Sequence, residues 1–100
     1  MKHVEGGKIY NTETAERIAS NSYSNPTDFY YWSETLYRTK KGAWFLYCEG
    51  GAASQYNKVV SQNSWVGGEQ IRTLSGIEAQ AWLEKVDAEA CVKYFQCEEA

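Results

Sequence analysis

Histidine, proline and long apolar runs are scarce in this 100-residue sequence, and each shortage excludes a class of protein. The one histidine is His3, so there is no imidazole pair to bind a transition metal and no histidine base to activate a nucleophile. The single proline excludes proline-rich and collagen-like chains. No stretch approaches the roughly 20 apolar residues that span a bilayer, and the first residues lack the apolar core of a signal peptide. We therefore expect a cytoplasmic protein with no membrane partner, no metal and no cofactor.

Cysteine is limited to Cys48, Cys91 and Cys97, an odd number that cannot form a complete set of intrachain disulfides. Free thiols are expected. Six residues on a helix turn the chain by roughly 240°, so we predict that Cys91 and Cys97 neither bridge nor chelate together. Cys48 lies in an apolar strand candidate and is predicted to be a small buried hydrophobe.

Basic residues are also too few for a nucleic-acid binder, because 10 Lys and Arg against 13 Asp and Glu give a net charge of −3. With 43% hydrophobic and 23% charged residues the composition is that of an ordinary globular protein. The length suits one compact core, so residues 1–100 are predicted to form a single domain.

The N-terminal third is predicted to contain one short extended segment and one helix. Residues 8–10 are apolar enough for a strand. Residues 12–20 are predicted to be helical, because Thr12 can cap and Ala15, Ile18 and Ala19 recur at helical spacing. The polar residues 20–28 then form an exposed loop.

A β-hairpin is the strongest local prediction. Residues 29–39 and 43–49 are rich in aromatic and β-branched residues, and Lys40-Lys41-Gly42 separates them. A three-residue loop with glycine at the positive-φ position sets the register, which pairs Arg38 with Trp44, Tyr37 with Phe45, Leu36 with Leu46 and Glu34 with Cys48.

The C-terminal third is predicted to hold a strand over residues 70–74 and two helices. Ser75 and Glu78 form a capping box for a helix through Val86. Its buried stripe is predicted to be Ile77, Ala81, Trp82 and Val86, and Asp87 can cap a last helix. The expected fold class is therefore α+β: a small, mainly antiparallel sheet with a central hairpin, one N-terminal helix and two C-terminal helices.

Features that would support catalysis are missing. The glycine pairs at 50–51 and 67–68 lack a following Lys-Ser/Thr and stand beside Glu49 and Glu69, so tight turns with positive φ are predicted instead of a phosphate loop. Glu34 and Glu49 fall on opposite faces of the predicted hairpin and cannot flank one bond. We expect a protein that is not an enzyme.

Aromatic residues are abundant, with eight Tyr, four Trp and three Phe. Four of them cluster with Ser, Asn and Asp near residue 30, which is the composition of recognition surfaces: Tyr23, Tyr30, Tyr31 and Trp32. Two interpretations stay open, namely a partner-binding surface and filling of the core. Residues 75–100 carry six acidic and two basic residues. Glu84, Asp87 and Glu89 are accordingly either a solvated helix face or an acidic surface directed at a basic groove.

A family resemblance bears on these alternatives. Residues 34–52 (ETLYRTKKGAWFLYCEGGA), residues 10–15 (YNTETA), and Leu74-Ser75 with Ala79 and Trp82 resemble a family of small, mostly uncharacterised proteins on phages and mobile elements of Firmicutes. Cys48 stands where that pattern has Gly or His. Small acidic proteins of this kind include anti-CRISPR proteins, so the resemblance implies an inhibitor of host defence.

The resulting expectation is a protein that binds a CRISPR effector in the bacterial host cell and blocks its access to nucleic acid. Its contacts would be the four aromatic residues and the three acidic helix residues. The alternative is a small-ligand (nucleotide or metabolite) binding protein or enzyme of a mobile element that uses the Gly-Gly segments, with Glu49 and Glu69 as polar anchors. A homodimer joined through an exposed sheet edge also stays open. The sequence names neither the effector nor the inhibited step.

Overall fold

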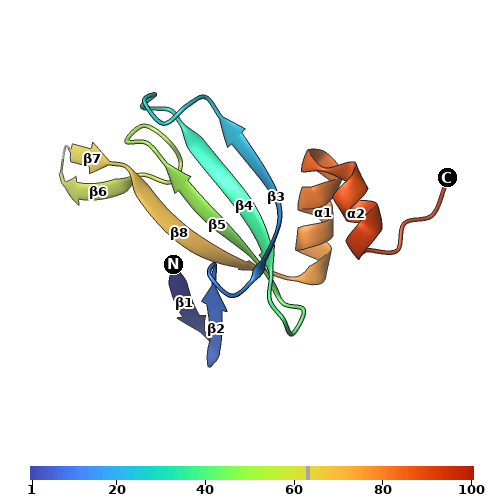
Figure 1. Ribbon diagram of the computed structural model, residues 1–100. Coiled ribbons are helices and arrows are strands. Elements are labelled where there is room, and N and C mark those ends of the chain that lie inside the picture. The colour runs from blue at the N-terminus through green and yellow to red at the C-terminus, as the bar shows by residue number, and fades with distance from the viewer. Residues whose placement is uncertain (63) are drawn as a thin grey trace.

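The computed structural model describes residues 1–62 and 64–100, and Figure 1 shows an antiparallel sheet with two helices beside it and small hairpins at its margins. The elements follow the chain as β1 (Lys2–Glu5), β2 (Lys8–Asn11), β3 (Glu16–Tyr23), β4 (Trp32–Arg38), β5 (Trp44–Gly50), β6 (Lys58–Ser61), β7 (Ser64–Val66), β8 (Gly68–Leu74), α1 (Gly76–Val86) and α2 (Ala88–Tyr94). Strands hold 44% of the residues and helices 18%, so the protein is sheet-rich with a small C-terminal helical part.

The β4–β5 hairpin is the centre of the sheet, whose strand order is β3-β4-β5-β8. Its register agrees with the prediction from Arg38 opposite Trp44 to Glu34 opposite Cys48. Gly42 takes a φ of +88°, and the Thr39 amide donates to the Ala43 carbonyl at 2.8 Å. The glycine therefore closes the turn, and alternation then assigns each side chain to a face.

The predicted N-terminal helix is wrong. Residues 16–23 form β3, an edge strand that pairs with β4 from Glu16 opposite Arg38 to Tyr23 opposite Trp32. A β-bulge between Arg17 and Ala19 lets the adjacent Ile18 and Ala19 pack against the same core, whereas Ala15 packs in the cluster on the other face. A helix of about ten residues is marginal alone, and here the pairing with β4 decides the conformation.

The two C-terminal helices and their caps are confirmed. Ser75 and Glu78 make the capping box of α1, and Asp87 accepts the Ala90 amide at the start of α2. The buried stripe differs from the prediction, because Ala79 and Leu83 are buried whereas Ile77 is 81% exposed. The stripe is thus displaced around the helix from the predicted one. In the described part of the chain, no helix has the length and apolar character needed to cross a bilayer.

Different ends of the chain cover the two faces of the sheet. On one face the helices pack over a core that includes Leu36, Leu46 and Cys48. On the other, the β1–β2 hairpin brings Tyr10 edge-on against Phe45, at 5.7 Å between ring centroids. The predicted extended segment at residues 8–10 is confirmed as part of β2, whereas β1 was not predicted.

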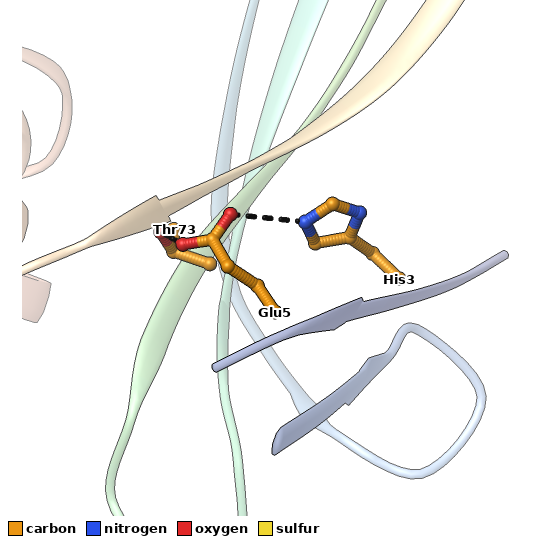
Figure 2. A network of polar contacts seen from close by, with 3 residues as sticks. All are labelled: His3, Glu5 and Thr73. Atoms are coloured by element: carbon orange, nitrogen blue, oxygen red, sulfur yellow. Dashed lines mark hydrogen bonds and ion pairs between the residues drawn. The ribbon is translucent and has the colours of Figure 1, made fainter. Parts of the chain in front are cut away.

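A polar contact fastens the N-terminal hairpin to the far strand of the sheet. Thr73 on β8 donates to a Glu5 carboxylate oxygen at 2.8 Å, and the other oxygen lies 3.1 Å from Nε2 of His3 (Figure 2). Hydrogen bonds from His3 and then Thr73 lower the pKa of Glu5. The carboxylate is thus held over the sheet.

Candidate functional site

Two carboxylates meet on the face of the sheet that the helices leave uncovered. Glu49 on β5 stands directly opposite Glu69 on β8. The Tyr47 hydroxyl donates to Glu69 and lies 3.4 Å from Glu49. Two further hydroxyls reach Glu49, from Ser33 at 3.3 Å and from Tyr31 at 3.5 Å. Like charges directly opposite on neighbouring strands repel, and these hydroxyl groups partly offset that repulsion.

Tyr47 is held in its neutral form at this carboxylate pair. Partial burial is the main cause of its raised pKa, and the hydrogen bond to Glu69 and the nearby negative charges raise it further. The neutral phenol is a hydrogen-bond donor, and a group so hard to deprotonate is a poor base or nucleophile at neutral pH. The arrangement therefore suits binding of a positively charged group better than proton abstraction.

The carboxylate pair lies in an open cavity of about 760 Å³, which we call the acidic cavity. Its wall is completed by Met1, Pro26, Tyr31, Lys58 and the glycines 50, 51, 67 and 68. The prediction that these glycines supply positive φ is wrong, since in the described residues only Gly6, Gly7 and Gly42 among the glycines do so. They are needed for close approach: a Cβ at Gly51 would lie 2.7 Å from the Phe29 carbonyl oxygen.

The predicted partner-binding aromatics divide between two environments. Tyr23 and Tyr30 are 55% and 64% exposed. Trp32 is half-buried, stacks on Tyr23 at 6.5 Å and packs against the helix-side core. Tyr31 is also half-buried, and its hydroxyl faces Glu49 on the other side of the sheet. Phe29, which is not among the predicted residues, is 72% exposed and extends the Tyr30 surface.

The predicted acidic residues lie on the helices. Glu84 on α1 and Glu89 on α2 are exposed. Asp87 is partly buried and accepts the Ala90 amide at 3.1 Å, so its carboxylate is committed to the cap of α2. Figure 1 places these helices at the side of the sheet away from the β3–β4 loop. The aromatic and acidic sets are therefore separate surfaces.

Glu34 is the centre of a polar cluster on the helix-covered face. Its carboxylate accepts the Trp82 indole N–H at 3.0 Å and the Tyr56 hydroxyl. This cluster joins β4, α1 and the segment after β5. Glu34 and Glu49 lie on opposite faces, as predicted. Sequence spacing held no signal for the cluster, because its partners are 22 and 48 residues from Glu34.

Cys48 is fully buried beside this cluster, which confirms its predicted packing role. Burial is the main cause of the raised pKa of its thiol, which makes the thiolate scarce at neutral pH. The Cys48 thiol is therefore a poor nucleophile.

The prediction that Cys91 and Cys97 do not bridge is confirmed, because both thiols are free, but the separation expected from helical rotation is wrong. Their sulfur atoms are 3.9 Å apart, because α2 ends at Tyr94 and the chain turns back toward Cys91 before reaching Cys97. The helical rotation that was assumed to separate them does not continue to residue 97. Elsewhere in the described chain, no group of three His, Cys, Asp or Glu side chains is placed to hold a metal ion.

Comparison with protein-family models, with curated proteins and with solved structures finds no match for this chain.

Proposed function

We propose that this protein is a non-enzymatic inhibitor of a bacterial host-defence system that binds a CRISPR effector and blocks its access to nucleic acid. The observation that carries the proposal is a group of exposed aromatic rings at one end of the sheet, which we call the aromatic end: Tyr23, Phe29 and Tyr30. Large aromatic side chains are favoured at protein interfaces because they offer rigid contact area with a polar edge.

Several hydrogen bonds brace the loop that carries Phe29 and Tyr30. Asp28 accepts the Ser24 hydroxyl at 2.6 Å and the Tyr30 amide at 2.8 Å, and these bonds lower its pKa. The Gly51 amide donates to the Tyr31 carbonyl at 2.7 Å, and the Ala53 amide to that of Phe29 at 2.8 Å. A preorganised loop loses less conformational entropy on binding, which favours affinity.

The acidic helix surface supports the same proposal through charge. Glu84 and Glu89 are exposed on neighbouring helices. A negative surface is attracted to a groove lined with Lys and Arg, such as one that normally holds nucleic acid. The attraction is screened by salt, so binding through this surface weakens as ionic strength rises.

The test is capture of the partner from a host lysate with the tagged protein, followed by affinity measurement with variants. We expect Tyr23→Ser/Phe29→Ser/Tyr30→Ser to reduce the affinity at least about tenfold, because aromatic hot spots contribute 2 kcal/mol or more. The matched control is Val4→Ser/Ile9→Ser, which removes two comparably exposed apolar side chains from the N-terminal hairpin, outside both proposed contact surfaces. Equal affinity of the aromatic variant and the wild type would exclude the aromatic end.

A second candidate function is binding of a small cationic metabolite in the acidic cavity. It is favoured by the meeting of Glu49, Glu69 and both glycine pairs around one space, whose volume is within the usual range for ligand sites. Lys58 in the wall offsets one of the two carboxylate charges, and the remaining negative charge favours an amine over a phosphate. A diamine such as putrescine is the probe. It should raise the melting temperature of the wild type and not that of Glu49→Gln/Glu69→Gln, and equal shifts in both would exclude the site.

A further inference from the structure

A second cavity, of about 500 Å³, lies between the N-terminal hairpin and the turn that joins β4 to β5. We call it the lysine cavity. One wall is β2 with the residues beside it, and the other is the turn that begins at Thr39. Every charged residue that lines it is a lysine, namely Lys8, Lys40 and Lys41. Three lysines therefore line one cavity in a protein whose net charge is −3.

No carboxylate of the described residues forms an ion pair with these lysines. Among the described residues, the one ion pair joins His3 and Glu5, so none of the three ammonium groups is in one. Glu5 lies opposite Lys8 in the hairpin register, yet its oxygens are bonded to His3 and Thr73 on the sheet (Figure 2). Glu16, which lines an adjoining hollow, accepts the Tyr94 hydroxyl at 2.8 Å.

The remaining lining suits a ligand with an anionic end and an apolar body. Asn11 accepts the Glu13 amide through Oδ1 at 2.9 Å, which leaves its side-chain NH₂ group as a further donor. Ile9, Tyr10 and Ala43 provide the apolar part of the wall. Tyr10 is buried and fixed against Phe45, so this part of the wall is rigid.

The backbone around the cavity is set by glycine. Gly6 and Gly7 both have positive φ, as the two-residue turn between β1 and β2 requires, and Lys8 follows this turn directly. Gly42, also at positive φ, closes the turn that carries Lys40 and Lys41. The three lysines thus belong to two tight turns whose backbones are set by glycine.

We propose that the lysine cavity binds a small phosphate monoester, with the phosphate at the three ammonium groups and the organic part on Ile9, Tyr10 and Ala43. A phosphate dianion can contact several ammonium groups at once, which a monocarboxylate does less well. The lysines gather in one concave site instead of along a strip, and the chain is acidic overall, so a small ligand fits better than a nucleic-acid backbone.

The experiment is a two-dimensional amide NMR titration of the intact protein with phenyl phosphate. The expected result is saturable shifts of the amides of residues 7–11 and 39–43, with phenol giving none and inorganic phosphate giving weaker binding. Lys8→Gln/Lys40→Gln/Lys41→Gln should weaken binding about tenfold, because each exposed ammonium contact contributes roughly a factor of two. These lysines are on the surface, so the variant should keep the wild-type spectrum elsewhere.

Lys58→Gln/Lys85→Gln/Lys93→Gln is the matched control, since it removes the same charge outside the cavity. It should bind phenyl phosphate within about twofold of the wild type. The proposal is overturned by an equal loss in both triple variants, or by the absence of saturable shifts at roughly 10 mM ligand. Tighter binding of a single-stranded oligonucleotide at the same amides would also overturn it, in favour of a nucleic-acid site.

Discussion

The Tyr56 hydroxyl is the sharpest place to test whether the Glu34 cluster stabilises the fold. Tyr56 is 8% exposed and reaches across the helix-covered face to donate to the Glu34 carboxylate. Tyr56→Phe removes that one oxygen atom and keeps the ring that packs in the core. Glu34 retains its bond from Trp82 at 3.0 Å, so the carboxylate is not left without a donor.

The expected magnitude follows from the charge of the acceptor. A hydrogen bond to a charged group contributes about 1.5–3 kcal/mol to the free energy of unfolding. Glu34 is half-buried and keeps one partner, which favours the lower end, about 1.5–2 kcal/mol. For a domain of this size each kcal/mol changes the melting temperature by about 4–8 °C, so Tyr56→Phe should melt about 10 °C lower.

Urea unfolding followed by circular dichroism measures this difference, with Tyr30→Phe as the control. Tyr30 is exposed, so loss of its hydroxyl should change stability by less than about 0.5 kcal/mol. If Tyr56→Phe proves as stable as Tyr30→Phe, the bond to Glu34 contributes nothing and the argument from burial fails.

Three further predictions concern other parts of the molecule. The pKa of Tyr47 is raised above its ordinary value of 10.0, so the contribution of Tyr47 to stability is complete below pH 10.0 and is lost as the pH rises. Alkaline ultraviolet titration of Tyr47→Phe should therefore show one fewer late-ionising phenol than the wild type, and an unchanged titration curve would contradict this. Gly51→Ala should cost about 1–3 kcal/mol because its Cβ meets backbone. Gly76→Ala, with nothing within 4 Å, should be neutral or stabilising in the same thermal melts, and equal effects would refute the close-approach argument. Oxidation with diamide should form a disulfide between Cys91 and Cys97, detected by mass spectrometry as a loss of about 2 Da, and Cys97→Ser should abolish it. If diamide in the presence of glutathione gives only mixed disulfides with glutathione, the two thiols do not meet.

The sequence pattern predicted the elements whose conformation is determined by residues near one another in the chain. The β4–β5 register follows from Gly42 and from alternation, and both helix starts follow from the caps at Ser75 and Asp87. The β3 strand was not predicted because its conformation depends on pairing with β4. Ala15, Ile18 and Ala19 recur at helical spacing, yet they pack in two different core clusters. The β1–β2 hairpin did have a signal that went unused, since a Gly-Gly pair between two extended runs is typical of such turns.

The candidate sites divide in the same way. Glu49 and Glu69 were named as polar anchors beside glycines, and the pairing of β5 with β8 brings them together. The convergence of Tyr56 and Trp82 on Glu34 depends on tertiary packing, so no spacing in the sequence could indicate it. The nearness of Cys91 and Cys97 depends on where α2 ends, which helical arithmetic alone does not provide.

The covering of one sheet by the two ends of the chain has a consequence for folding. Glu5 bonds Thr73 across 68 residues, and Tyr94 bonds Glu16 across 78. On a ribosome, the first hairpin leaves the exit tunnel long before β8 and the helices exist, and until then neither face of β4 and β5 can be fully covered. Chains dominated by such distant contacts fold in roughly milliseconds to seconds. Residues 1–100 should therefore fold as one cooperative unit, and only after the ribosome has released the segment that carries Tyr94.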